Sequence, residues 1–200
     1  MSRVLIGISG PARAGKDTFA NFVKRRLYEK ERLQPKRYAF AAPIKYGLKA
    51  MFGWTEDHVD GELKDVLDER LNIIPREAMQ GLGDWGRTEN LWLMLAREVF
   101  AQSLPHGLVI SDVRTEFEAD WIRSEGGAVV VLRSTAATTT GVLSKRAAQH
   151  RTEVTLAPNR LDYHTNPFAG PVELEIEAIR FAEWFLKQRK LNKEYVKSVT

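Results

Sequence analysis

Residues 4–18 read Val-Leu-Ile-Gly-Ile-Ser-Gly-Pro-Ala-Arg-Ala-Gly-Lys-Asp-Thr, and this stretch decides the fold. Its first part, Val4–Ile8, is a nearly continuous apolar run, which is typical of a strand buried on both faces. Gly10, Gly15 and Lys16 then follow in the spacing G-x-x-x-x-G-K. Beyond the lysine, apolar residues recur at helical spacing at Phe19, Phe22, Val23 and Leu27. The order of strand, glycine loop and helix predicts a phosphate-binding loop.

The chemistry of this loop suits a phosphorylated ligand. Glycine lets the backbone turn tightly, so that successive N–H groups point at phosphate oxygens. The helix that follows directs its positive end at the same anion. Lys16 adds a full positive charge that can reach the β- and γ-phosphates of a nucleotide. We therefore predict that Gly10, Gly15 and Lys16 bind the phosphates of a phosphorylated ligand.

Three oxygen-bearing side chains are candidates for a Mg²⁺ site. The residue after the loop lysine is usually a Ser or Thr that holds Mg²⁺, but here it is Asp17, with Thr18 behind it. Asp112 ends an apolar strand pattern, where a Walker-B acid belongs. Other interpretations stay open, because Asp17 also suits a helix N-terminus or a base toward a hydroxyl acceptor. An aspartate after a strand is likewise a common turn residue.

The rest of the chain alternates between strand and helix patterns. Strands are predicted at 38–41, 108–112, 128–132 and 161–165, and helices at 43–52, 75–85, 90–103 and 172–186. Residues 54–74 are polar and mixed, and we interpret them only as helix and loop. Thr115 has the pattern of a helix N-cap, with Glu118 in the matching position of a capping box. The alternation predicts an α/β fold with a mainly parallel sheet.

Length and composition indicate one soluble domain. The chain has 200 residues, of which 44% are hydrophobic and 28% charged, which is enough to bury a core. It has no cysteine, which excludes disulfides and thiolate metal sites and fits a reducing compartment. No stretch approaches the roughly 18 apolar residues of a membrane span, so we expect a cytoplasmic protein without a membrane partner. The net charge of +4 can attract phosphorylated small molecules or nucleic acid.

Five short motifs, taken in order, carry a resemblance to a known family. They are Gly10–Thr18, Ala42-Pro43-Ile44-Lys45, Ala78-Met79-Gln80-Gly81-Leu82-Gly83, Asp112-Val113-Arg114 and His150-Arg151-Thr152-Glu153. The chain resembles the deoxynucleoside monophosphate kinases of tailed phages from its first strand to the region of Asn166. The resemblance implies a P-loop kinase fold over residues 1–200, with a five-stranded parallel sheet flanked by helices. It also implies an acceptor-binding helical arm at about 54–104 and a lid at 134–160, a stretch without clear apolar period.

The resemblance implies roles for individual residues as well. ATP would be bound by Arg13, Gly15, Asp17 and Thr18 alongside Lys16, and the catalytic candidates are Lys16, Arg13, Asp17 and Asp112. The acceptor nucleotide would be bordered by Ala12, Ile44, Lys45, Arg70, Arg76, Gly83, Asp84, Trp92, Arg114 and Glu118. The cations of the lid would be Lys145, Arg146 and Arg151. Structural interpretations stay open for Glu118 as a capping residue, for Trp92 as core, and for the lid cations as a solvated helix face.

The implied reaction is Mg²⁺-assisted transfer of the ATP γ-phosphoryl group to a (deoxy)nucleoside monophosphate, giving the diphosphate. The acceptor is a phosphate oxygen that is already ionised at neutral pH, so no strong general base is needed. One alternative is a P-loop kinase for a hydroxyl acceptor, such as a hydroxymethylated base in DNA or another small metabolite. Another is a nucleotide-binding ATPase that is not a kinase. The nucleobase, the sugar and the oligomeric state stay open, a homodimer included, and a phage protein would work in the host cytoplasm.

Overall fold

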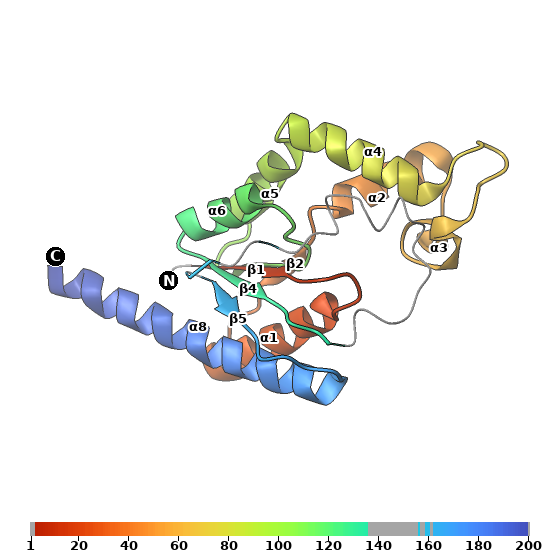
Figure 1. Ribbon diagram of the computed structural model, residues 1–200. Helices are drawn as coiled ribbons and strands as arrows, with labels where there is room; N and C mark the ends of the chain where they lie inside the picture. The colour runs from red at the N-terminus through yellow and green to blue at the C-terminus, as the bar shows by residue number, and fades with distance from the viewer. Residues whose placement is uncertain (1–2, 136–155, 157–158, 161, 200) are drawn as a thin grey trace. The chain divides into compact units, whose positions relative to one another are not determined.

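The computed structural model describes residues 3–135, 156, 159–160 and 162–199 (Figure 1). The chain divides into two compact units, each with its own internal contacts. Residues Met1–Arg37 and Ser103–Thr200 form the first, which we call the sheet unit. Residues Tyr38–Gln102 form the second, which we call the helical unit. The helical unit therefore contains nearly all of the stretch predicted as an arm, and it begins earlier in the sequence.

The described elements are as follows. The sheet unit contains β1 (Val4–Ser9), α1 (Lys16–Glu31), β2 (Lys36–Tyr38, which ends at the unit boundary), β3 (Gly107–Ile110), α6 (Glu116–Ser124), β4 (Ala128–Val131), β5 (Tyr163–His164) and α8 (Pro171–Val199). The helical unit contains α2 (Ala42–Phe52), α3 (Glu56–Val59), the 3-10 helix η1 (Glu62–Asp65), α4 (Pro75–Thr88) and α5 (Leu91–Ala101). None of the described helices is both long and apolar enough to cross a membrane.

The sheet has five strands in the order β2-β3-β1-β4-β5 within the described chain. β1 lies at the centre, parallel to β3 on one side and to β4 on the other. Ile6, for example, is opposite Val109 of β3 and Ala128 of β4. Because the strands are parallel, their carboxyl ends meet at one edge of the sheet, and the glycine loop follows β1 at that edge. The predicted α/β fold with a five-stranded parallel sheet flanked by helices is confirmed.

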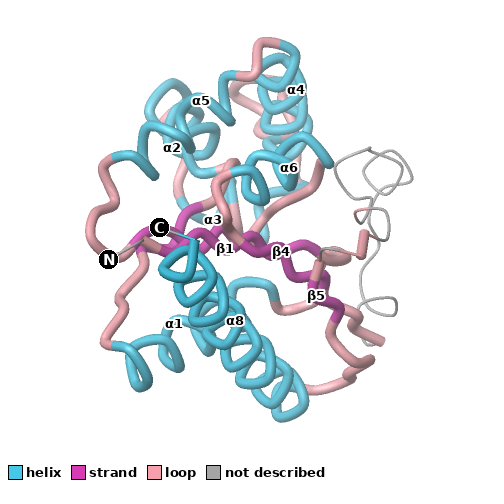
Figure 2. The backbone as a smooth tube through the Cα atoms, turned by 90° about the vertical axis from the view of Figure 1, so that its left-hand side faces the viewer, coloured by secondary structure: helices cyan, strands magenta, loops and turns pink. Residues whose placement is uncertain are grey.

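Helices cover both faces of this sheet, which explains why β1 is apolar throughout (Figure 2). Ile6 and Ile8 point into a core shared with α1 and α8, where the rings of Phe19 and Phe181 lie 6.0 Å apart. Gly7 faces α6 on the other side. A Cβ at Gly7 would lie 2.5 Å from the side chain of Ile122, so glycine lets α6 approach the strand closely.

Most of the predicted strands differ from the structure at their boundaries: β4 ends one residue early, and the strand predicted at 161–165 is the short β5. Two further differences have a clear physical reason. The strand predicted at 38–41 is instead β2, which begins at Lys36. Since β2 is an edge strand, Lys36 and Arg37 are exposed, and no apolar pattern marks them. The strand predicted at 108–112 ends at Ile110, because the chain leaves the sheet there to form the site described below. The closing helix predicted at 172–186 is confirmed and continues to Val199 as α8.

Candidate functional site

The glycine loop is fastened at its base between the two neighbouring strands. The carbonyl of Ser9 accepts a hydrogen bond from the backbone N–H of Leu132, at 2.9 Å. The carbonyl of Ile8 accepts one from the N–H of Val113, at 3.1 Å. These bonds tie the end of β1 to the segments that follow β4 and β3. The loop therefore starts from a rigid point at the carboxyl edge of the sheet.

The loop backbone needs its two glycines. Gly10 has φ 144°, and a Cβ there would lie 2.9 Å from the Cβ of Leu132. Gly15 has φ 76° and caps α1, and its Cβ would lie 2.8 Å from a methyl carbon of Leu174. Arg13 also adopts a left-handed conformation, with φ 62°, which costs about 1 kcal/mol for a non-glycine residue. Left-handed residues in such a turn aim successive N–H groups into one concavity, the arrangement that binds anions.

Lys16 is folded back over the loop. Its ammonium group donates hydrogen bonds to the carbonyl oxygens of Gly10, at 3.0 Å, and Pro11, at 2.8 Å. The lysine is the first residue of α1, whose first turn carries N–H groups that the helix itself does not pair. The positive charge, the helix dipole and the loop N–H groups thus share one small region. Binding of a phosphate by these groups stays a prediction.

Asp17 is held by two residues that the sequence did not single out. The hydroxyl of Ser111 donates to Oδ1 of Asp17 at 2.6 Å, and the guanidinium of Arg37 lies 3.5 Å from the same oxygen. Ser111 is buried and follows β3 directly, so its place at the carboxyl edge of a parallel sheet was the available signal. Arg37 lies in a strand of three residues, whose pattern gave no such signal.

The residues predicted to hold Mg²⁺ offer oxygen ligands of the right kind. Among the described residues, no group of three or more His, Asp or Glu side chains could hold a metal ion unaided. Mg²⁺ in phosphoryl transfer needs less, because one or two protein oxygens bind it together with the phosphates and water. Asp17 and Thr18 are both exposed in the first turn of α1, and Asp112 is half-buried beyond β3. Their chemistry fits such a shared site.

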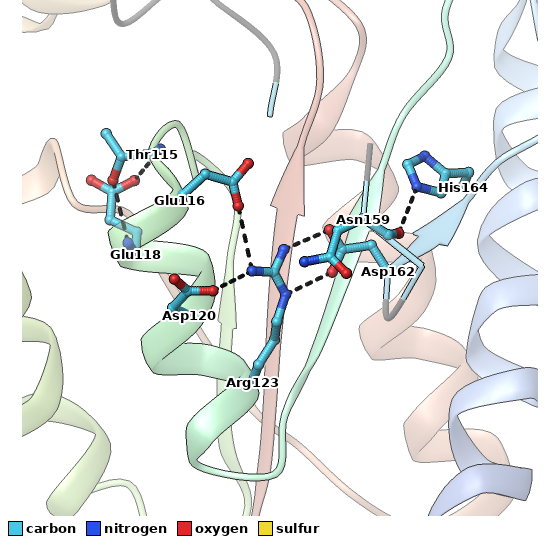
Figure 3. Close-up of polar contacts among 8 residues, drawn as sticks. All are labelled: Thr115, Glu116, Glu118, Asp120, Arg123, Asn159, Asp162 and His164. Atoms are coloured by element: carbon cyan, nitrogen blue, oxygen red, sulfur yellow. Dashed lines mark hydrogen bonds and ion pairs between the residues drawn. The ribbon is translucent and has the colours of Figure 1, made fainter. Parts of the chain in front are cut away.

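Residues after β3 build the start of α6. Thr115 and Glu118 form the predicted capping box: the Glu118 N–H donates to the Thr115 hydroxyl, and the Glu118 carboxylate accepts from the Thr115 N–H (Figure 3). The same carboxylate accepts from the N–H of Arg114 at 2.8 Å. Glu118 is buried, so its carboxylate serves the local backbone. Contact of Arg114 and Glu118 with an acceptor nucleotide stays a prediction.

In the helical unit, the three cations predicted to meet the acceptor each pair with an aspartate. The pairs are Lys45 with Asp60, Arg70 with Asp68, and Arg76 with Asp65. Each carboxylate fixes the direction of a long, flexible side chain. Such pairing lowers the entropic cost of presenting the cation to an anion. The sequence did not reveal these partners, because most of them come from different turns or helices.

The pair formed by Arg70 and Asp68 is the most completely built of the three. Arg70 donates to both carboxylate oxygens of Asp68, at 3.0 and 2.7 Å, and Trp54 adds an indole N–H bond of 2.7 Å. The guanidinium of Arg70, followed by the indole of Trp54, lowers the pKa of Asp68 to about 2. The Asp68 side chain is only 5% exposed, whereas that of Arg70 is 63% exposed. A buried carboxylate therefore holds an exposed cation in place.

The remaining predicted acceptor residues lie in different surroundings. Trp92 is buried, and its indole N–H donates to the carbonyl of Gly83 at 2.8 Å. Ile44 is also buried, and Asp84 pairs with Arg87 at 3.0 Å. Ala12 is half-buried in the glycine loop of the sheet unit. Their predicted contacts with an acceptor stay predictions, and the predicted lid cations Lys145, Arg146 and Arg151 lie outside the described residues.

The sheet, the glycine loop and the flanking helices form a P-loop kinase fold, as predicted. No family model matches the chain. Among solved structures, a gluconokinase of Sinorhizobium meliloti 1021 is similar, with a TM-score of 0.49 and 15% identity over 92% of this chain and 97% of that one. A shikimate kinase of Bacteroides thetaiotaomicron has a TM-score of 0.42 and 15% identity, over 90% of this chain and 97% of its own.

A curated relative is more similar in sequence. It is a protein of Acanthamoeba polyphaga mimivirus that is provisionally named a deoxynucleotide monophosphate kinase. The two are 32% identical over 145 residues, which cover 64% of this chain and 72% of the relative. The chain therefore belongs to the family of P-loop, nucleoside monophosphate kinase-like phosphotransferases that the mimivirus protein represents.

Proposed function

We propose that the protein transfers the γ-phosphoryl group of ATP to a deoxynucleoside monophosphate and so produces the diphosphate. The observation that carries this proposal is the 32% identity to the mimivirus relative, whose name specifies a deoxynucleotide monophosphate substrate. The geometry of the glycine loop supports the binding of ATP as the phosphoryl donor. The same proposal includes that the protein comes from a tailed phage and acts in the cytoplasm of the host cell.

The loop supplies positioning and charge neutralisation. The loop N–H groups and the start of α1 hold the phosphates, and Lys16 neutralises charge that shifts during transfer. Arg13 brings a second cation to the loop and is exposed. A Mg²⁺ ion bound through Asp17, Thr18 or Asp112 would supply further neutralisation of the phosphate oxygens. Since the acceptor oxygen is already ionised at neutral pH, no residue has to remove a proton.

On the acceptor side, the proposal relies on preoriented cations. Lys45, Arg70 and Arg76 of the helical unit are each held by an aspartate, and their guanidinium or ammonium groups suit a nucleotide phosphate. We assign the acceptor phosphate to Arg70 first, because its guanidinium is exposed while its partner Asp68 is buried. Arg114 is the corresponding candidate in the sheet unit.

The test is ADP release measured with ATP, Mg²⁺ and a panel of deoxynucleoside and nucleoside monophosphates. We expect ADP release that depends on at least one deoxynucleoside monophosphate, and we expect Lys16→Ala to lower it by about 100-fold or more, because a preorganised charge is lost. Lys30→Ala is the matched control, since Lys30 lies in the last turn of the same helix. Near-normal turnover in Lys16→Ala would contradict the proposal.

The same assay separates the alternatives. ADP release that requires duplex DNA with a hydroxymethylated base, and that falls steeply with salt, would identify a nucleic acid acceptor. Release with a small hydroxyl compound and with no nucleotide acceptor would identify a metabolite kinase. ATP hydrolysis at the same rate with and without any acceptor would identify an ATPase.

A further inference from the structure

Ser111 and Asp17 lie far apart in the sequence and are joined in the sheet unit by one short hydrogen bond. The Ser111 hydroxyl donates to Oδ1 of Asp17 at 2.6 Å, across 94 positions of the chain. Ser111 follows the last residue of β3, and Asp17 is the second residue of α1. The bond therefore connects two neighbouring strand ends through the start of the phosphate-binding helix.

The burial of the two side chains is unequal. Ser111 is only 4% exposed, whereas the side chain of Asp17 is 67% exposed. A buried hydroxyl requires a hydrogen-bond partner, and Asp17 provides it. The serine is thus the fixed member of the pair, and the aspartate is the member that faces solvent. A hydroxyl anchored in this way sets the orientation of the carboxylate.

Both contacts of the Asp17 carboxylate within the described chain fall on the same oxygen. Arg37 lies 3.5 Å from Oδ1, the atom that Ser111 also meets. The Arg37 side chain is 47% exposed, so its ion pair with Asp17 is of the weak surface kind. The hydrogen bond from Ser111 constrains Asp17 more strongly than the ion pair does. It is short, at 2.6 Å, and only one rotatable bond positions the oxygen of the serine side chain. Neither of these two contacts involves Oδ2.

Asp17 occupies the place where this kind of loop usually carries a metal-binding hydroxyl. A carboxylate at this position brings a full negative charge and two oxygens. One oxygen can therefore accept a hydrogen bond that orients the group, while the other stays available to a cation. We propose that Ser111 is a positioning residue for the divalent cation that accompanies ATP: its hydroxyl holds Oδ1 of Asp17 and keeps Oδ2 available to that cation. The inference rests on the proposed function only for ATP and Mg²⁺, and it does not depend on the acceptor.

The test measures nucleotide binding without catalysis. Isothermal titration calorimetry of the full chain with a β,γ-methylene analogue of ATP is run once with Mg²⁺ and once with EDTA. Partners that orient a metal ligand typically contribute 10- to 100-fold to metal affinity. For Ser111→Ala we therefore expect the ratio of the two dissociation constants to fall about 10-fold, with the EDTA value unchanged. Lys16→Ala should instead weaken binding under both conditions.

Three further variants separate positioning from stability. Ser111→Cys fills nearly the same space with a weak donor and should lower the ratio as Ser111→Ala does. Ser103→Ala is the matched control, because Ser103 is equally buried, at 4% exposed, and precedes β3 at the other end of the strand. Its ratio should match that of the wild type. In an Asp17→Asn background, Ser111→Ala should cause no further change, since the residue through which it acts is already altered.

The calorimetry has clear outcomes for and against the role of Ser111. A wild-type ratio in both Ser111→Ala and Ser111→Cys overturns the inference, and so does an equal loss of binding with and without Mg²⁺. Because no acceptor is present, a wrong acceptor assignment leaves this measurement unchanged. A wild-type protein that does not bind the analogue overturns the ATP part of the proposed function, and the inference with it.

Discussion

At the scale of single residues, the hydrogen bonds of Asp68 to Arg70 and Trp54 make its contribution to stability depend on pH. Its pKa of about 2 lies below the value of about 3.9 in an unfolded chain, so the unfolded state binds protons first as the pH falls. The contribution of Asp68 to stability is therefore complete above about pH 5 and is lost progressively toward about pH 2. This sign follows from the charged partner Arg70 and the indole of Trp54.

We predict that Asp68→Asn lowers the free energy of unfolding at pH 7 and that its difference from the wild type shrinks between about pH 4 and pH 2. Urea unfolding followed by tryptophan fluorescence at several pH values measures this difference. Glu69→Gln is the control, because the neighbouring Glu69 is exposed and should show a much smaller effect. A difference that stays constant down to pH 2 would contradict the assigned pairing.

If Arg70 binds the acceptor phosphate, the same variant has a second effect. Asp68→Asn would leave the Arg70 side chain less well oriented, so the KM for the nucleoside monophosphate should rise while the KM for ATP stays unchanged. Steady-state kinetics at pH 7 measure both constants. An unchanged KM for every acceptor would remove Arg70 from the proposed acceptor residues.

At the scale of elements, the contact between α4 and α5 is set by one glycine. A Cβ at Gly86 would lie 2.2 Å from the indole of Trp92, which is buried and hydrogen-bonded to Gly83. Trp92 is 6% exposed, and moving its ring aside would disturb its hydrogen bond to Gly83. At Gly81, in the same helix, a Cβ would meet nothing within 4 Å.

We predict opposite signs for the two alanine substitutions in α4. Gly86→Ala should destabilise the protein by about 1–3 kcal/mol through overpacking. Gly81→Ala should stabilise it by about 0.5–1 kcal/mol, because alanine restricts the unfolded chain and favours helix. Thermal unfolding of both variants makes the comparison. If Gly86→Ala proves as stable as Gly81→Ala, the close contact with Trp92 is absent.

At the scale of the whole molecule, a buried ion pair joins distant parts of the sheet unit. Arg123 of α6 makes a bidentate contact with Asp162, just before β5, at 2.9 and 2.7 Å (Figure 3). The side chain of Arg123 is 12% exposed and that of Asp162 is fully buried. Arg123 also contacts Asp120, whose side chain is 69% exposed. Glu116, 46% exposed, lies 3.4 Å from the same guanidinium, so the cation has one buried partner and two at the surface.

We predict that Asp162→Ala lowers the free energy of unfolding by about 3–5 kcal/mol, because it leaves a buried guanidinium without its main partner. Asp120→Ala, which removes the more exposed of the two surface partners, should cost about 1 kcal/mol or less. Urea denaturation of the two variants gives both values. Equal losses would show that burial does not distinguish the two partners.

The sequence by itself determined the order of the elements in the sheet unit and the place of the glycine loop between β1 and α1. These features are local: β1 is apolar throughout because both of its faces are covered, and the loop needs Gly10 and Gly15 because their φ angles are positive. The capping box of Thr115 and Glu118 was readable for the same reason, since its members are three positions apart. Patterns of this kind depend only on neighbours along the chain.

Only the tertiary structure decided which side chains meet. Ser111 reaches Asp17 across 94 positions and Arg123 reaches Asp162 across 39, and no periodic pattern encodes such contacts. The edge strand β2 was misplaced because Lys36 and Arg37 face solvent and carry no apolar signal. Long-range pairing depends on how strands and helices are arranged in space. From the sequence, Asp17 was only an unusual residue in the loop motif. The structure shows that its carboxylate is held by the buried Ser111.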